Sequence, residues 1–250
     1  MLPGFSGHLI SESFLERLLS EEPRLGESSD LLRHRLAICR GRSQSLGPAS
    51  SLRALLEEGA APFVRELGFG DPADVEALKD SLVATISSGS GPVALVVASW
   101  GLRLESLWRA GVVHARRRGA AWCLFFNGIH ARLIDASRLY SRRHVQFDLD
   151  VALDDARASA ALLTVLRAAS FSIVEGHRES MLHRLVESSE RDAAEVRRTL
   201  RHGVLQAAVD VLGTLMVRRR PPAIDNAFEQ ERSSANREAG GRHLRRPTTP

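Results

Sequence analysis

Apolar residues recur at helical spacing in the first part of the chain. Residues 9–22 carry one apolar face, formed by Leu9, Ile10, Phe14, Leu18 and Leu19. Residues 40–51 are polar and rich in Gly, Ser and Pro, as in a linker. Helical spacing resumes over residues 52–67, where Pro62 should kink or split the helix. Asp71 and Pro72 suit an N-cap and a first helical position, which predicts a further helix from residue 71 to about Ile86.

The centre of the chain has the pattern of strands. Residues 92–99 are apolar and rich in Val, which is typical of a buried strand. Residues 104–118 have the apolar face of a helix. Residues 122–149 indicate three strands, and the pair Asn127-Gly128 favours a type I′ hairpin turn between the first two. Trp108 on the helix, and Trp122 and Phe125 on opposite faces of one strand, are expected in the core, which requires a sheet covered on both sides.

The last third of the chain is predicted to be helical. Helices are expected at residues 156–170, at 177–187 and from about Glu190 to Val217. From Arg218 onward the chain is basic and has too little apolar surface to fold alone. The sequence therefore predicts an α/β (α+β) fold with a helical segment at 1–47, an α/β domain at 48–150, a helical segment at 151–217 and a disordered basic tail at 218–250.

Composition narrows the class of protein. No apolar run approaches the ~18 residues of a membrane span, and the N-terminus lacks the pattern of a signal peptide. We therefore expect a cytoplasmic protein without a membrane partner. Cys39 and Cys123 are isolated, which suggests neither a zinc site nor a disulfide framework. Residues 218–250 carry eight Arg and four acidic residues, so this segment has a net charge of +4. The whole chain also has a net charge of +4, so residues 1–217 have no net charge.

The order of helix, buried strand, second helix and hairpin resembles the core of PD-(D/E)xK nucleases. In that core the middle strand carries an acidic residue and E-x-K, which hold Mg²⁺ and the attacking water. The equivalent strand here has neither a carboxylate nor a lysine, and Lys79, the only lysine, lies before it. We therefore expect a nuclease-like sheet without catalytic residues. Asp80, Glu105 and Asp135 are at most degenerate acidic remnants, for which capping or solvated roles are the alternative.

Four residues of one loop are candidates for DNA binding. Arg138, Tyr140, Arg142 and Arg143 lie within six positions, and guanidinium groups beside an aromatic ring suit phosphate or base contacts. The alternative is a solvated loop at a strand edge. DNA binding shared between this loop and the basic tail should be weak and sensitive to salt.

No motif for a cofactor or a metal is present in the sequence. Gly89-x-Gly91 precedes a strand instead of following one, so a dinucleotide or S-adenosylmethionine loop is not expected there. The phosphate-loop motif GxxxxGK[ST] is absent, and the nine histidines are scattered. The chain itself is therefore expected to bind no cofactor and no metal.

Several spaced motifs nevertheless occur in a recognisable order. They are W-G-x-x-L-x-x-x-W-R-x-x-V at 100–112, W-C-L-x-F-N-G at 122–128, R-L-x-D-A at 132–136, R-x-Y-S-R-R-x-x-x-F-D-L at 138–149 and L-x-H-G-V-L at 200–205. This pattern resembles the N-terminal region of large type IIG-like restriction–modification DNA methylases, a bacterial phage-defence family, over about residues 5–230. For a full-length homologue the resemblance implies adenine-specific DNA methylation and restriction, with S-adenosylmethionine and Mg²⁺.

The sequence departs from this family after the helical segment. The family continues there into a methyltransferase domain that flips an adenine out of the duplex. Here the residues after 230 are polar and basic, and no [DNS]PP[YFW] tetrapeptide is present. The expected function is that of a truncated, catalytically silent N-terminal fragment that positions DNA or contacts a separate methyltransferase domain. The alternatives are an atypical Mg²⁺-dependent DNA nuclease and a non-enzymatic protein-interaction module.

Overall fold

The computed structural model describes residues 1–21, 24–138, 142–173 and 178–218. Contacts divide the chain into two units, Met1–Glu195 and Val196–Pro250. The sheet and the helices that flank it belong to the first unit. The predicted disordered tail lies outside the described residues from position 219 onward.

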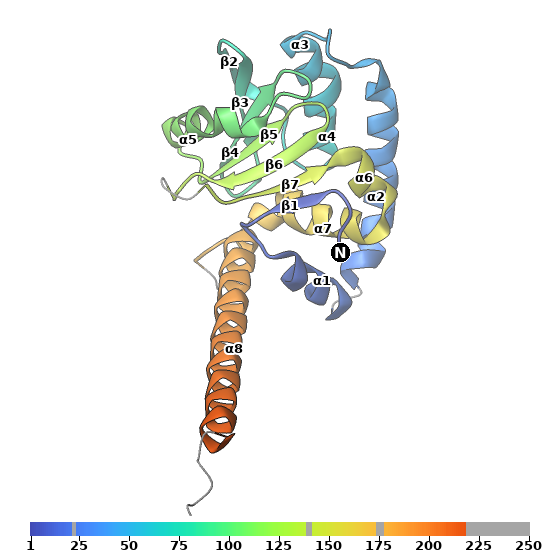
Figure 1. The fold of residues 1–250 in the computed structure, drawn as a ribbon. Coiled ribbons are helices and arrows are strands. Elements are labelled where there is room, and N and C mark those ends of the chain that lie inside the picture. The colour runs from blue at the N-terminus through green and yellow to red at the C-terminus, as the bar shows by residue number, and fades with distance from the viewer. Residues whose placement is uncertain (22–23, 139–141, 174–177, 219–250) are drawn as a thin grey trace, which may run out of the picture. The chain divides into compact units, whose positions relative to one another are not determined.

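A mixed sheet of seven strands forms the centre of the first unit, in the order β1-β7-β6-β5-β4-β3-β2 (Figure 1). Its strands are β1 (Phe5–Gly7), β2 (Ala73–Ala77), β3 (Ser81–Ser87), β4 (Pro92–Ala98), β5 (Trp122–Phe126), β6 (His130–Asp135) and β7 (His144–Asp148). Strands β4 and β5 are parallel and are joined by a 3₁₀ turn, η3 (Leu104–Leu107), and helix α5 (Trp108–Arg117), whereas the other neighbours are antiparallel. The α/β fold predicted from the sequence is therefore confirmed.

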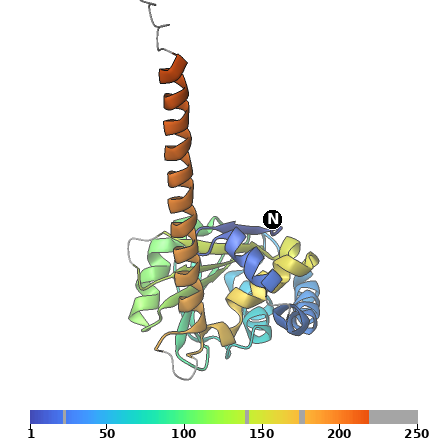
Figure 2. The ribbon, with the colours of Figure 1, turned by 90° about the horizontal axis from the view of Figure 1, so that it is seen from below.

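Helices cover both faces of this sheet (Figures 1 and 2). The larger layer consists of α1 (Glu12–Glu21), α2 (Arg24–Arg42), η1 (Ser43–Ser45), α3 (Leu52–Ala54), the π-turn η2 (Leu55–Ala60), α4 (Ala61–Glu66), α6 (Leu149–Asp154), α7 (Ala156–Leu166) and η4 (Ala168–Phe171). Helix α5 lies on the opposite face. Trp122 packs in the core under the larger layer, and Phe125 packs in the core under α5. The prediction that both are core residues on opposite faces is confirmed.

The helix predicted for residues 71–86 is wrong. This segment forms β2, a turn and most of β3. Strand β3 pairs with β4 along its whole length, from Ser81 opposite Ala98 to Ser87 opposite Pro92. Pairing with a buried neighbour outweighs the local signal for a helix start, because strand formation depends on packing more than on local preference. Lys79 consequently lies in the exposed β2–β3 turn instead of in a helix.

The two ends of the first unit also differ from expectation. Strand β1 pairs with β7, so the first residues of the chain belong to the sheet. Residues 40–42, predicted as part of a linker, end helix α2. At the other end a single helix, α8 (Met181–Arg218), replaces the two predicted for residues 177–217, and its first turns belong to the first unit. No helix within the described residues is long and apolar enough to cross a membrane.

Candidate functional site

The sheet face under α5 is apolar in one half and polar in the other. Side chains alternate along β6, so that Ala131 and Leu133 join the larger core while Arg132 points to the opposite side. The register places Gln146 of β7 beside Arg132, and His144 beside Ile134. Helix α5 packs on β4 and β5, the strands next to this half of the sheet. We call His130, Arg132, His144 and Gln146 the polar strip.

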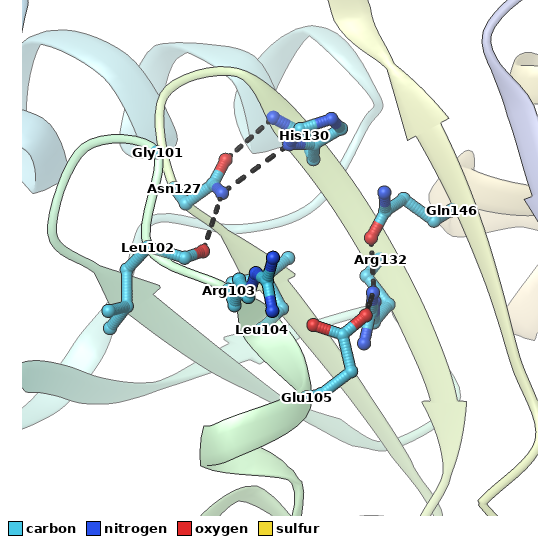
Figure 3. A pocket seen from close by; sticks show the side chains of 9 residues that line it. All are labelled: Gly101, Leu102, Arg103, Leu104, Glu105, Asn127, His130, Arg132 and Gln146. Atoms are coloured by element: carbon cyan, nitrogen blue, oxygen red, sulfur yellow. Dashed lines mark hydrogen bonds and ion pairs between the residues drawn. The ribbon is translucent and has the colours of Figure 1, made fainter.

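Arg132 is the buried cation of the polar strip, with 6% of its surface exposed. Its Nε donates a hydrogen bond to Oε1 of Gln146 at 2.7 Å, and its Nη2 donates to Glu105 (Figure 3). The Arg132 hydrogen bond holds the pKa of Glu105 below its usual range. Glu105 is 62% exposed. A buried guanidinium whose counter-ion faces the solvent can exchange that counter-ion for another oxyanion.

Asn127 fixes the rim of this region. Its Oδ1 accepts a hydrogen bond from the backbone N–H of Ile129 at 3.0 Å. Oδ1 also accepts from the backbone N–H of His130 at 2.7 Å, and Nδ2 donates to the carbonyl of Leu102 at 2.9 Å (Figure 3). The β5–β6 hairpin is therefore present, but it is not the expected type I′ turn, because only Gly128 of the pair has a positive φ. The asparagine side chain instead ties the hairpin to the loop that leads into η3.

Two cavities meet at the Glu105–Arg132 ion pair. The first has a volume of about 360 Å³ and is lined by Gly101, Leu102, Arg103, Leu104, Glu105, Asn127, His130, Arg132 and Gln146 (Figure 3). The second has a volume of about 380 Å³ and lies between η3, the start of α5 and strands β5 to β7. We call it the Trp108 cavity. It is lined by Leu104, Glu105, Ser106, Trp108, Arg109, Phe125, Arg132, Ile134, Arg142 and His144.

The Trp108 cavity carries an excess of positive charge. Three arginines, at 109, 132 and 142, face a single carboxylate, that of Glu105. Arg109 and Arg142 form no ion pair with any residue in the described part of the chain, and the guanidinium of Arg142 lies 6.0 Å from the centre of the Trp108 ring. Burial lowers the pKa of His144, and the charge of Arg132 lowers it further, so both disfavour the protonated ring. The cavity therefore favours anions.

The structure separates the residues of the predicted DNA-binding loop. Arg142 reaches the Trp108 cavity, but Arg138 and Arg143 both pair with Glu190 of α8, the first at 2.6 Å. Burial raises the pKa of Glu190, but the hydrogen bonds and charges of Arg138 and Arg143 outweigh it and leave the pKa below its usual range. Tyr140 lies outside the described residues. Arg142 is thus the member of this group that the structure brings to a cavity.

The acidic residues do not converge. Glu105 binds Arg132, whereas Asp135 accepts a hydrogen bond from the backbone N–H of Ser137 at 2.9 Å and lies 3.3 Å from Arg138. Asp80 is in the exposed β2–β3 turn. Within the described ranges, no group of three His, Cys, Asp or Glu side chains is placed to hold a metal ion.

Trp108 differs from its expected role as a core residue. It packs against the smaller core but stays half-buried, and its ring lines the cavity. Its Nε1 is buried and has no hydrogen-bond partner among the residues that the structure describes.

Sequence reasoning also missed Arg132 and His144, although the alternation of polar and apolar residues in His130–Asp135 is the signal of a strand with one open face.

Comparisons with known proteins identify no relative of this chain. No family model, no curated protein and no solved structure matches it. The geometry of the polar strip and of the Trp108 cavity therefore carries the functional argument.

Proposed function

We propose that this chain is the catalytically silent N-terminal part of a restriction–modification-type DNA methylase, and that it positions DNA in the cytoplasm. The observation that carries the proposal is the set of arginines around the polar strip. The buried Arg132 is surrounded by Arg103, Arg109 and Arg142. None of these three surrounding arginines forms an ion pair with a described residue. Phosphate oxygens are suited to such guanidinium groups, and contacts to phosphates position a protein on DNA without reading its sequence.

The absence of catalysis is supported by what the acidic side chains contact. Strand β4 contributes Val93, Leu95 and Val97 to the larger core and Ala94, Val96 and Ala98 to the smaller one, so its core positions hold no carboxylate. Glu105 and Asp135 have separate partners, and metal-dependent cleavage needs carboxylates that converge on one ion. Plasmid DNA incubated with the chain and Mg²⁺ should therefore remain intact. Cleavage that Glu105→Gln or Asp135→Asn abolishes would establish the alternative, an atypical nuclease.

DNA binding is tested by removing two cavity arginines together. If each exposed contact contributes about 0.7 kcal/mol, the variant Arg109→Ala/Arg142→Ala should bind a labelled duplex roughly tenfold more weakly in fluorescence anisotropy. The matched control is Arg53→Ala/Arg65→Ala, which removes the same charge from α3 and α4, where both side chains are exposed. An equal loss of affinity in both variants would mean that net charge, and not this site, governs binding.

A second candidate role, that of a protein-interaction module, is favoured by α8. In the second unit its residues Val196, Leu200, Val204, Val211 and Leu215 follow helical spacing and are 50% to 68% exposed. Exposed apolar stripes of this kind bind other proteins. A separate methyltransferase domain is the partner that the resemblance implies.

This second role is tested on the chain alone. Without its partner, the chain should self-associate through the stripe, and Leu200→Asp/Leu215→Asp should shift it to monomer in size-exclusion chromatography with light scattering. A wild-type chain that stays monomeric at high concentration would argue against the interaction role.

A further inference from the structure

The Trp108 cavity combines an apolar interior with a cationic rim. Leu104, Phe125 and Ile134 line its interior and are each at most 2% exposed, while the ring of Trp108 remains half-buried. Its volume of about 380 Å³ is in the range of small-ligand sites. Inorganic phosphate would leave the apolar walls uncontacted, and a purely apolar ligand would leave the arginines unpaired. The ligand class that satisfies both is a flat aromatic group joined to an anion.

Trp108 is suited to hold the aromatic part of such a ligand. Its ring lines the cavity and is half-buried, so a flat group in the cavity can pack against it. Arg142 lies over its ring at 6.0 Å, which leaves the indole beside a cation. Stacking of a nucleobase on an aromatic side chain is tolerant of sequence, because every base has a π-face.

Arg132 is suited to hold the anion. Gln146 fixes its Nε, so the plane of the guanidinium is set before a ligand arrives. The carboxylate of Glu105 accepts from Nη2 and thus occupies the position that a phosphate oxygen would take. Since Glu105 is 62% exposed, its side chain can turn into solvent when a phosphate replaces it. Nη1 of Arg132 has no partner in the described ranges and can donate a second hydrogen bond.

We propose that the Trp108 cavity binds a nucleoside 5′-monophosphate, with its base against Trp108 and its phosphate on Arg132 in place of Glu105. The nucleotide is either free or the 5′-terminal nucleotide of a DNA strand, and the second source rests on the proposed function. The phosphate would contact Arg109 or Arg142 at the rim as well.

Titration calorimetry of the full chain with 2′-deoxyadenosine 5′-monophosphate tests the proposal. The nucleotide should bind at least tenfold more tightly than deoxyadenosine and than inorganic phosphate. Binding of phosphate as tight as that of the nucleotide would reduce the cavity to a plain anion site and overturn the proposal. So would the absence of any binding.

Variants locate the site. Glu105→Gln removes the competing carboxylate at an exposed position, so the nucleotide should bind severalfold more tightly, whereas Trp108→Leu should weaken the nucleotide and leave phosphate unaffected. Arg132→Gln should abolish binding, and circular dichroism would show whether this buried change preserves the fold. The control Arg53→Ala/Arg65→Ala should bind as the wild type does. Unchanged affinity in both Glu105→Gln and Trp108→Leu would place the ligand elsewhere and overturn the proposal.

The DNA source is tested with duplexes that end in a 5′-phosphate or a 5′-hydroxyl. Tighter binding of the phosphorylated duplex, lost on adding excess nucleotide, would assign the cavity to a DNA end, whereas equal binding of both duplexes would leave the free nucleotide as the ligand. If the nucleotide fails to bind but duplex binding still depends on Arg109 and Arg142, this inference is wrong and the proposed function stands. If the nucleotide binds and DNA does not, the proposed function is wrong and the nucleotide site stands.

Discussion

Gly111 lies where α5 packs against Phe125 and Cys123 of β5, and replacing it with alanine tests the packing that forms the Trp108 cavity. A Cβ atom at this position would lie 2.3 Å from Cζ and 2.9 Å from Cε1 of Phe125, and 3.3 Å from Sγ of Cys123. Phe125 is 1% exposed, so its ring cannot move into solvent. Either α5 must lift from β5, or the ring must move toward the cavity that it lines.

Two opposing effects determine the stability of Gly111→Ala. Alanine in place of glycine inside a helix stabilises it by about 1 kcal/mol. Forcing an extra methyl group into a packed core costs about 1–3 kcal/mol. The clash should outweigh the gain, which leaves a net destabilisation of about 1 kcal/mol and a melting temperature lower by about 2–4 °C for a domain of this size.

Thermal unfolding monitored by circular dichroism measures this effect, with Gly41→Ala as the control. Gly41 lies near the end of α2, and a Cβ atom there would meet no atom within 4 Å. The control should therefore gain about 0.4–1 kcal/mol. A Gly111→Ala variant that is stabilised as much as Gly41→Ala would show that α5 does not pack on Phe125 as described, and the cavity would lose its basis.

Further predictions concern acid stability, thiol reactivity and cofactor binding. Because Arg138 and Arg143 lower the folded-state pKa of Glu190, this residue stabilises the fold fully above its unfolded pKa of about 4.3, and the contribution is lost as the pH falls through the lower folded value. In Glu190→Gln the urea midpoint should therefore fall less steeply with decreasing pH in that acidic range than it does in the wild type. A midpoint that falls as steeply as in the wild type would contradict the pairing of Glu190 with Arg138 and Arg143. Cys123 is fully buried and burial raises the pKa of its thiol, so a thiol reagent should modify it only after unfolding; rapid labelling of native Cys123 would show an open core. Titration with S-adenosylmethionine should show no saturable binding, and a micromolar dissociation constant would contradict the proposal of a silent fragment.

The strands whose pattern was strongest could be predicted from the sequence. The apolar run of β4 and the strands from Trp122 onward form where expected. Their consecutive or alternating apolar residues indicate buried strands directly in the sequence. Residues 71–86 could not be predicted in the same way, since Asp71-Pro72 resembles a helix start and only the pairing of β3 with β4 decides the outcome. Strand β1 has three residues, which is too short for a recognisable pattern.

The candidate site was predicted only in part. The cluster of arginines at 138–143 indicated this loop as a binding site. In the structure, however, Arg138 and Arg143 form ion pairs with Glu190. Glu190 is distant in the sequence, so no local pattern predicts this contact. Arg142 was found, whereas Arg109 and Arg132 were missed. They come to the same cavity because α5 packs on β4 and β5, so that its first turn faces the polar side of β6 and β7, and this depends on tertiary packing.

The salt dependence of duplex binding tests the central claim most directly, because its slope measures contacts to phosphates. The logarithm of the binding constant falls with the logarithm of salt concentration by roughly 0.9 per neutralised phosphate. The full chain, Arg109→Ala/Arg142→Ala and the control Arg53→Ala/Arg65→Ala would be compared on one duplex. The slope of the cavity variant should be shallower than that of the wild type by up to about 1.8, and that of the control should be unchanged. Equal slopes for all three proteins would contradict the claim that this face of the sheet positions DNA.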